Sequence, residues 1–151
     1  MVIDTRQEAH ALRVWVTDDD PDDHLLFSLA AEEADLDSSL TFLFNGGELL
    51  EMLSRTSTDW LPEIIVLDLR MPGMGGHRTL HHLRSDPRTA TLPVIVFTTS
   101  TRHEDRDLAI DAGASAVVVK PIRFPHMVEF VASLADRVCD AGLIEPQEPT
   151  R

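Results

Sequence analysis

The sequence predicts an α/β fold, a doubly wound parallel sheet of five strands with helices on both faces. Short apolar runs alternate with helix-like stretches five times along the 151 residues. The runs are rich in Val, Ile and Phe and show little apolar/polar alternation, which is typical of parallel strands buried on both faces. Repeated strand–helix–strand units also imply right-handed crossovers within one compact domain.

The predicted strands are bordered by turn or helix-start residues. They span residues 14–17, 40–44, 64–67, 94–98 and 116–119. Pro62 and Pro93 each stand shortly before a strand, as expected where a loop leads into it. This succession and the chain length favour a flavodoxin-like sheet with the strand order 2-1-3-4-5.

The predicted helices begin or end at capping residues. The first has Asp20 as its N-cap, Pro21 at the first helical position, and Asp22 and Asp23 in its first turn. Aspartate is favourable at these positions, so we expect only a helix-start role for these three acids. The other helices are expected over residues 47–55, 77–85, 104–112 and roughly 125–141.

One domain is expected over residues 13–141, with an N-terminal arm over residues 1–12 and a flexible tail over residues 142–151. The tail is rich in Pro and Glu, which is typical of a chain end that does not pack. Nothing after the last predicted helix suggests an output domain, so we expect a stand-alone unit.

The composition excludes several classes of function. A formal net charge of −13 argues against nucleic acid, because binding to phosphates needs clustered Lys and Arg. No stretch is long and apolar enough for a membrane span, and residues 1–13 lack the apolar core of a signal peptide, so we expect neither feature. The single cysteine, Cys139, excludes an intramolecular disulfide. We therefore expect a soluble, cytoplasmic protein.

Polar residues follow four of the predicted strands. Asp18 and Asp19 follow the first, Asp68 the third, Thr98 closes the fourth, and Lys120 follows the fifth. Ligands of open α/β sheets bind at the carboxyl ends of the strands, so we expect these side chains to converge. Carboxylates this close would raise one another's pKa unless a cation intervened, and oxygen ligands suit Mg²⁺.

The predicted site has the parts for phosphoryl transfer to a carboxylate. Asp68 would be the nucleophile, Lys120 a fixed positive charge, and Thr98 a hydroxyl donor to a phosphoryl oxygen. An ionised aspartate is already nucleophilic, so no general base is needed.

These segments resemble the receiver domains of two-component response regulators. The resemblance rests on the pair Asp18-Asp19, the stretch LDLRMPG around Asp68, Thr98, and GASAVVVKP, which contains Lys120. It covers roughly residues 13–141 and implies that Asp68 accepts a phosphoryl group from a histidine kinase. The protein would then be a phosphorelay switch and not an enzyme.

The resemblance also implies the metal ligands. Asp19 would bind Mg²⁺ directly and Asp18 through water. Asp68 and the backbone carbonyl of Arg70 would be the other ligands that the protein supplies.

Two further expectations concern the fifth strand and the residues after it. By resemblance, Thr98 and Lys120 would contact the phosphoryl group, and the Lys120–Pro121 bond would be cis. Receiver domains commonly carry an aromatic switch residue where this chain has Val117, so switching by a turning ring is not expected.

Within the family, the chain is most similar to small regulators paired with phytochrome-type sensor kinases. This similarity implies a histidine kinase as one partner, another protein as the output, and a homodimer through the fourth helix, fifth strand and fifth helix.

The sequence disfavours three alternatives to a phosphate-accepting receiver domain. A haloacid-dehalogenase-like phosphatase would want a second Asp two residues after Asp68, where the chain has Arg70. A phosphate-independent receiver is disfavoured because all five signature positions are intact. His77 and His81 lie four apart, but neither a cysteine nor an HExxH motif accompanies them, so a zinc site is not expected.

Overall fold

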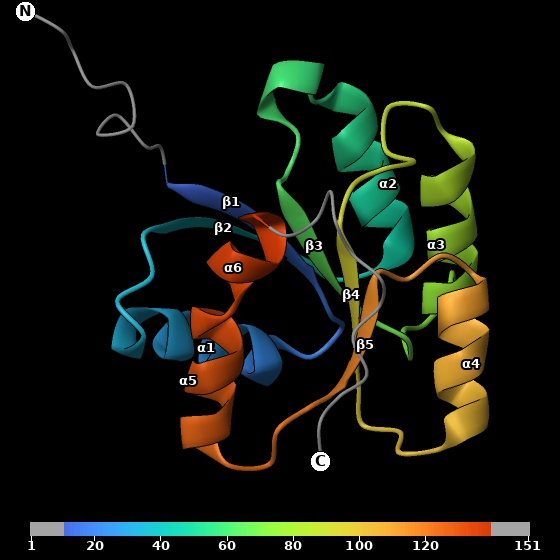
Figure 1. Cartoon of the computed structure of the whole chain (residues 1–151). Coiled ribbons are helices and arrows are strands. Elements are labelled where there is room, and N and C mark those ends of the chain that lie inside the picture. Colours follow the sequence, from blue (N-terminus) through green and yellow to red (C-terminus); the bar gives the residue numbers. More distant parts are fainter. Residues whose placement is uncertain (1–10, 140–151) are drawn as a thin grey trace, which may run out of the picture.

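The computed structural model of the chain, described over residues 11–139, is a parallel sheet between two layers of helices (Figure 1). Residues 1–10 of the predicted arm and the whole predicted tail, residues 142–151, lie outside the described part. Of the remaining arm residues, Leu12 already belongs to the first strand. No helix within the described part is long and apolar enough to cross a membrane.

The strands occupy the predicted positions to within two residues at each end. They are β1 (Leu12–Thr17), β2 (Ser38–Leu43), β3 (Ile64–Asp68), β4 (Val94–Thr98) and β5 (Ala116–Val119). All neighbouring pairs are parallel, and the order across the sheet is β2-β1-β3-β4-β5. The predicted fold and strand order are therefore confirmed.

The helices cover both faces of the sheet, as Figure 1 shows, with α1, α5 and α6 on one face and α2, α3 and α4 on the other. They are α1 (Pro21–Glu33), α2 (Gly46–Arg55), α3 (Gly76–Ser85), α4 (His103–Asp111), α5 (Phe124–Ala132) and α6 (Leu134–Cys139), and a short 3₁₀ turn, η2, spans Thr58–Trp60.

The central strand β3 accounts for the continuous apolar run in the sequence. Ile64 and Val66 pack with α1 and α5, whereas Ile65 and Leu67 pack with the layer on the opposite face. All five residues of β3 are buried, including Asp68 at its end. Burial on both faces thus leaves no polar alternation, and the one acid stands where the strand meets the edge of the sheet.

The predicted last helix differs from the structure, because it is divided at Ser133. The Ser133 hydroxyl donates a hydrogen bond to the carbonyl of Phe130 at 2.6 Å, three residues back. Its backbone N–H is shared between the carbonyls of Glu129 and Phe130. A serine that bonds back to the preceding turn tightens and bends a helix, which explains the change from α5 to α6.

A half-buried arginine holds the edge of the sheet opposite the predicted site. The Arg84 guanidinium of α3 donates to the carbonyls of Leu92 at 2.7 Å and Gly113 at 2.8 Å, and further bonds reach Thr89, Ala90 and the Ser115 hydroxyl. Burial lowers the pKa of Arg84. These bonds join α3 to the segments that lead into β4 and β5.

Gly113 makes the approach of Arg84 possible. It has φ of +110°, which favours glycine, and a Cβ there would lie 2.6 Å from the Arg84 Cγ.

Arg84→Met is expected to lower the free energy of unfolding by about 2–4 kcal/mol, because it leaves several partly buried carbonyls without their donor. Urea denaturation monitored by circular dichroism measures the change. Arg55→Met is the matched control, since the exposed Arg55 pairs, among the residues the structure describes, only with the exposed Glu51 on its own helix. Equal denaturation midpoints for the two variants would contradict the role assigned to Arg84.

Candidate functional site

The predicted site residues come together at the carboxyl edge of the sheet. Asp18 follows β1 directly and Asp68 ends β3, and the pairing of Thr17 with Leu67 in the parallel register sets the two acids on adjacent strands. Thr98 ends β4, and Lys120 follows β5. The topology therefore gathers residues that lie up to 102 positions apart in the chain.

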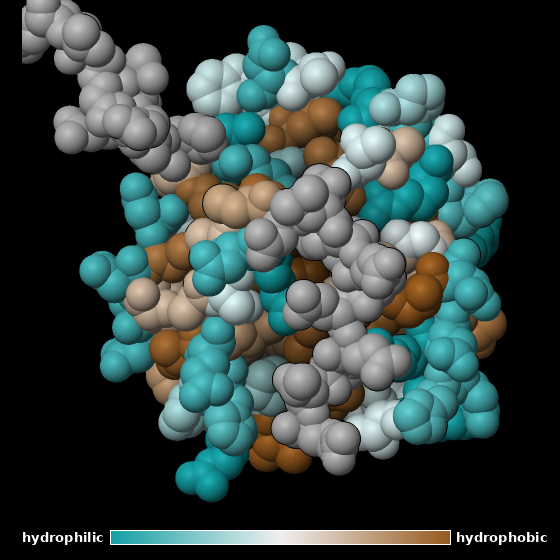
Figure 2. All heavy atoms as spheres, viewed as in Figure 1, coloured by the Kyte–Doolittle hydropathy of each residue, from teal (hydrophilic) through white to brown (hydrophobic). Residues whose placement is uncertain are grey.

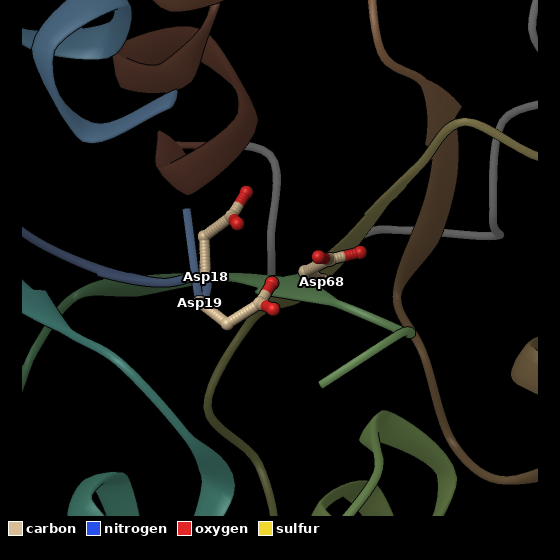
Figure 3. A group of neighbouring side chains, drawn as sticks. All are labelled: Asp18, Asp19 and Asp68. Atoms are coloured by element: carbon tan, nitrogen blue, oxygen red, sulfur yellow. The ribbon is translucent and has the colours of Figure 1, made fainter. Parts of the chain in front are cut away.

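Three carboxylates form a cluster. Asp18, Asp19 and Asp68 each offer an oxygen, and these oxygens lie within 4.8 Å of one another. Figure 3 shows Asp18 and Asp19 extending from the end of β1 toward the same region as Asp68. The side chains of Asp18 and Asp68 are only 5% and 9% exposed, whereas Asp19 is open to solvent.

The ammonium group of Lys120 lies among the acids. Its Nζ is 2.6 Å from Asp18 Oδ2, 2.8 Å from Asp23 Oδ2 and 3.5 Å from Asp68 Oδ2. Burial would lower the pKa of Lys120, but the hydrogen bonds with Asp18 and Asp23 outweigh burial and raise it. The group therefore stays charged and offsets part of the negative charge of the pocket.

The main chain fixes the position of Lys120, whose backbone N–H donates to the Thr98 carbonyl at 2.7 Å. The described residues contain no cis peptide bond, so the Lys120–Pro121 bond is trans and the predicted cis bond is wrong.

Burial raises the pKa of both acids at the strand ends. The pKa of Asp18 rises to about 6, with burial outweighing the opposing hydrogen bond from Lys120. Burial also raises the pKa of Asp68, against the charge of Lys120 and the backbone N–H of Arg70. In the absence of a cation, these two carboxyl groups therefore keep their protons to a higher pH than exposed aspartates do.

Metal-free wild-type protein is expected to gain stability relative to Asp18→Asn as the pH falls from about 8 to about 5. The pKa of Asp18 is about 6 in the folded protein against an ordinary 3.8, so the folded state binds a proton that the unfolded state lacks in this range. Stability from this group is complete below the ordinary pKa and is lost as the pH rises through about 6. Urea titrations at several pH values measure the difference.

Asp37→Asn is the control for the pH series, because Asp37 is exposed and precedes β2 at the other edge of the sheet. A stability difference between wild type and Asp18→Asn that stays constant across the pH range would contradict the expected proton uptake.

Thr98 and Arg70 are the remaining residues of the predicted site. Thr98 is buried, and its Oγ1 accepts a hydrogen bond from the Ser100 N–H at 3.1 Å, while the neighbouring Thr99 is exposed. The Arg70 side chain is exposed, and its backbone N–H donates to Asp68 Oδ1 at 3.3 Å. The turn that contains Arg70 thus bends back over the carboxylate of Asp68.

A close packing of backbones holds this turn against α3. A Cβ on Gly76 would lie 2.7 Å from the Leu69 Cα and 2.8 Å from the Asp68 carbonyl oxygen. Only glycine allows the start of α3 to approach the end of β3 so closely.

Asp23 belongs to the site, although the sequence predicted only a helix-start role for it. The predicted cap is confirmed for Asp20, which accepts a hydrogen bond from the Asp22 N–H at 2.9 Å. Asp23, in contrast, turns inward and forms an ion pair with Lys120. A signal was available, because α1 begins at the same edge of the sheet as the other acids and its first turn must lie beside them.

The donor set suits a hard divalent cation. Within residues 11–139, Asp18, Asp19 and Asp68 are the only group of three or more His, Cys, Asp or Glu side chains close enough to share an ion. All three offer carboxylate oxygens, which Mg²⁺ prefers over nitrogen and sulfur. Among the described residues, His77 and His81 take no part in such a group.

The fold and this edge place the protein among the doubly wound α/β proteins whose ligand site lies at the carboxyl ends of the strands. The family model for the response regulator receiver domain matches residues 14–132, so the chain belongs to this family, as the sequence predicted.

Individual relatives agree with this assignment. An uncharacterized 14.6 kDa protein from the sodA1 3' region of Leptolyngbya boryana is 35% identical over 120 residues, which cover 78% of this chain and 86% of that protein. The chain spans less than half the length of several other curated relatives that it matches.

Solved structures of phytochrome and red-light response regulators share the fold. The response regulator RPA3017 in red light signaling of R. palustris is 27% identical, with a TM-score of 0.76 over 92% of this chain and 99% of that chain. The phosphorylated cyanobacterial phytochrome response regulator RcpA is 21% identical, with a TM-score of 0.76 over 94% of this chain and 100% of that chain.

Proposed function

We propose that the protein is a response regulator in which Asp68 accepts a phosphoryl group from a histidine kinase with Mg²⁺ present, and that this changes its binding to other proteins. The observation that carries the proposal is the position of Asp68, a nearly buried carboxylate that shares its pocket with two acids and a lysine.

The proposed transfer needs no general base. An Asp68 carboxylate oxygen forms a bond to phosphorus as the P–N bond of the kinase phosphohistidine breaks, and the electron pair of that bond stays on the imidazole nitrogen. The Asp68 nucleophile carries no proton when ionised. Lys120 stands 3.5 Å from Asp68 Oδ2 and would pair with a phosphoryl oxygen there. Thr98 would donate its hydroxyl to another oxygen from the end of β4.

Four groups of this chain would hold the cation: the carboxylates of Asp19 and Asp68, Asp18 through water, and the backbone carbonyl of Arg70. The clustering of the three acids within 4.8 Å supports this set. When bound, Mg²⁺ would neutralise the acids and the phosphoryl oxygens. It would also keep Asp68 ionised in a pocket that otherwise raises its pKa.

Phosphorylation would change the face made by α4, β5 and α5. The phosphoryl group adds about −1.5 to −2 charges, which would rearrange Thr98 and Lys120 at the ends of β4 and β5. Apolar side chains lie exposed on this face or beside it: Leu108, Val119, Ile122 and Phe124. Brown apolar patches over α1 and α5 and beside α4 are visible in Figure 2. We propose this face as the contact for a second copy or for a downstream protein.

The sensor is proposed to be a phytochrome-type histidine kinase in the cytoplasm. The similarity to RPA3017 of red light signaling and to the phytochrome response regulator RcpA supports this partner.

Incubation with acetyl phosphate tests the proposed reaction. We expect the intact mass to increase by one phosphoryl group with Mg²⁺ and not with EDTA, and peptide mapping to locate the group within residues 64–70. A mass that stays unchanged with both acetyl phosphate and candidate kinases would reject the proposal.

A further inference from the structure

Lys120 is the single lysine of the chain, and its ammonium group is held by an acid that the proposed reaction does not use. We propose that Asp23 is a positioning residue, which holds Lys120 on the α1 side of the pocket and competes for it with a phosphoryl group on Asp68. This inference rests on the proposed function, and it adds a regulatory role for the first turn of α1.

The distances show how Lys120 divides its hydrogen bonds. Two of its donors reach Asp18 at 2.6 Å and Asp23 at 2.8 Å, which are hydrogen-bond distances. The distance to Asp68 Oδ2 is 3.5 Å, which is too long for a strong charged hydrogen bond. The unmodified protein thus keeps its only lysine nearer to the two other acids than to the proposed acceptor.

The two acids that hold Lys120 differ in what replaces the lysine when it leaves. Asp18 also accepts from the Asp20 N–H at 3.0 Å, and its side chain is 5% exposed, so its release would leave a buried charge without its cation. Among the described residues, the Asp23 carboxylate has Lys120 as its only hydrogen-bond donor, and this side chain is 29% exposed. Water can therefore solvate Asp23 after release.

A phosphoryl group on Asp68 shifts this balance. It adds about −1.5 to −2 charges and strong acceptor oxygens next to the ammonium group. Lys120 then turns toward Asp68 and gives up Asp23, because Asp23 is the partner that water replaces at least cost. The ion pair that joins the first turn of α1 to the residue after β5 is lost in the same step.

Asp22 supplies a matched comparison for Asp23. Both acids lie in the first turn of α1 and have the same favourable interaction with its N-terminus, but Asp22 is exposed and its side chain has no partner among the described residues. A change specific to Asp23→Asn therefore reports the ion pair and not the loss of an acid from the helix start.

The single lysine makes the pair directly observable. Protein labelled with ¹³C,¹⁵N-lysine gives one Cε signal, which must come from residue 120. We expect this signal to shift in unmodified Asp23→Asn and to stay in place in Asp22→Asn. Backbone amide spectra of both variants check that the fold is intact.

Beryllofluoride, which mimics a phosphoryl group on an aspartate, tests the competition at saturating Mg²⁺. Asp23→Asn is expected to bind it about three to ten times more tightly than wild type, because no acid retains Lys120. Asp22→Asn is expected to match wild type. In wild type, the lysine signal should move on binding, and this movement should be smaller in Asp23→Asn.

Equal affinities of Asp23→Asn and wild type for beryllofluoride would overturn this inference while the proposed function stands. A Lys120 signal at the same position in unmodified Asp23→Asn and wild type would do the same. Wild-type protein that binds no beryllofluoride would instead overturn the proposed function, and the competition with it, before any variant is compared.

Discussion

Asp68→Asn protein is expected to take up no phosphoryl group from acetyl phosphate or from a kinase that modifies the wild type. The change removes the nucleophilic oxygen pair but keeps the shape of the side chain, so the loss is chemical and not structural. Intact-mass measurement at neutral pH with Mg²⁺ detects the modification. The metal-free variant should also be at least as stable as wild type, because burial disfavours the Asp68 charge.

Two comparisons sharpen this experiment. Asp37→Asn, which changes an exposed acid before β2, should be modified like the wild type. Modification that persists in Asp68→Asn would place the acceptor elsewhere. Sustained hydrolysis of a generic phosphate ester by wild type would revive the phosphatase alternative, which Arg70 disfavours because it stands where such an enzyme needs an acid.

Lys120→Met is expected to lower the stability of the metal-free protein by about 2–3 kcal/mol. Methionine keeps most of the apolar stem but leaves Asp18, Asp23 and Asp68 without their common cation, and removing one partner of a buried ion pair is strongly destabilising. The loss is smaller than for a fully buried ion pair, because water partly solvates Asp23. Urea denaturation at about pH 8, where the acids are charged, measures the loss.

Mg²⁺ should restore much of this loss, because a ligand at about one hundred times its dissociation constant adds about 2.7 kcal/mol. Arg123→Met, an exposed cation three residues further on, is the control and should change little. A Lys120→Met protein with wild-type stability at every Mg²⁺ concentration would show that the ammonium group does not hold the acids together.

The strands, and the edge of the sheet at which the site lies, could be predicted because each has a direct signal in the sequence. Burial on both faces makes a central strand such as β3 continuously apolar, and parallel strands send all their carboxyl ends to one edge. The acids and the lysine at those ends were therefore predictable as neighbours before any coordinates.

The features that escaped prediction depend on geometry that the sequence does not encode locally. Whether Asp22 or Asp23 turns inward depends on the rotation of α1 about its axis, which the packing of α1 against the sheet and α5 sets. Ser133 divides the last helix through a hydrogen bond that serine forms in some helices and not in others. Arg84 binds backbone carbonyls, and these carry no side-chain signature in the sequence.

The hydrogen bonds of Arg84 also determine which ends of β4 and β5 can move when the surroundings of Asp68 change. They join the segments just before β4 and β5 to α3, and the Ser115 hydroxyl oxygen accepts a further hydrogen bond from the Val94 N–H at 3.0 Å. Both strands are thus anchored at their amino ends and bear Thr98 and Lys120 at their opposite ends. A rearrangement around Asp68 would therefore act on the carboxyl ends of β4 and β5, next to the loops that lead into α4 and α5, and not on their anchored amino ends.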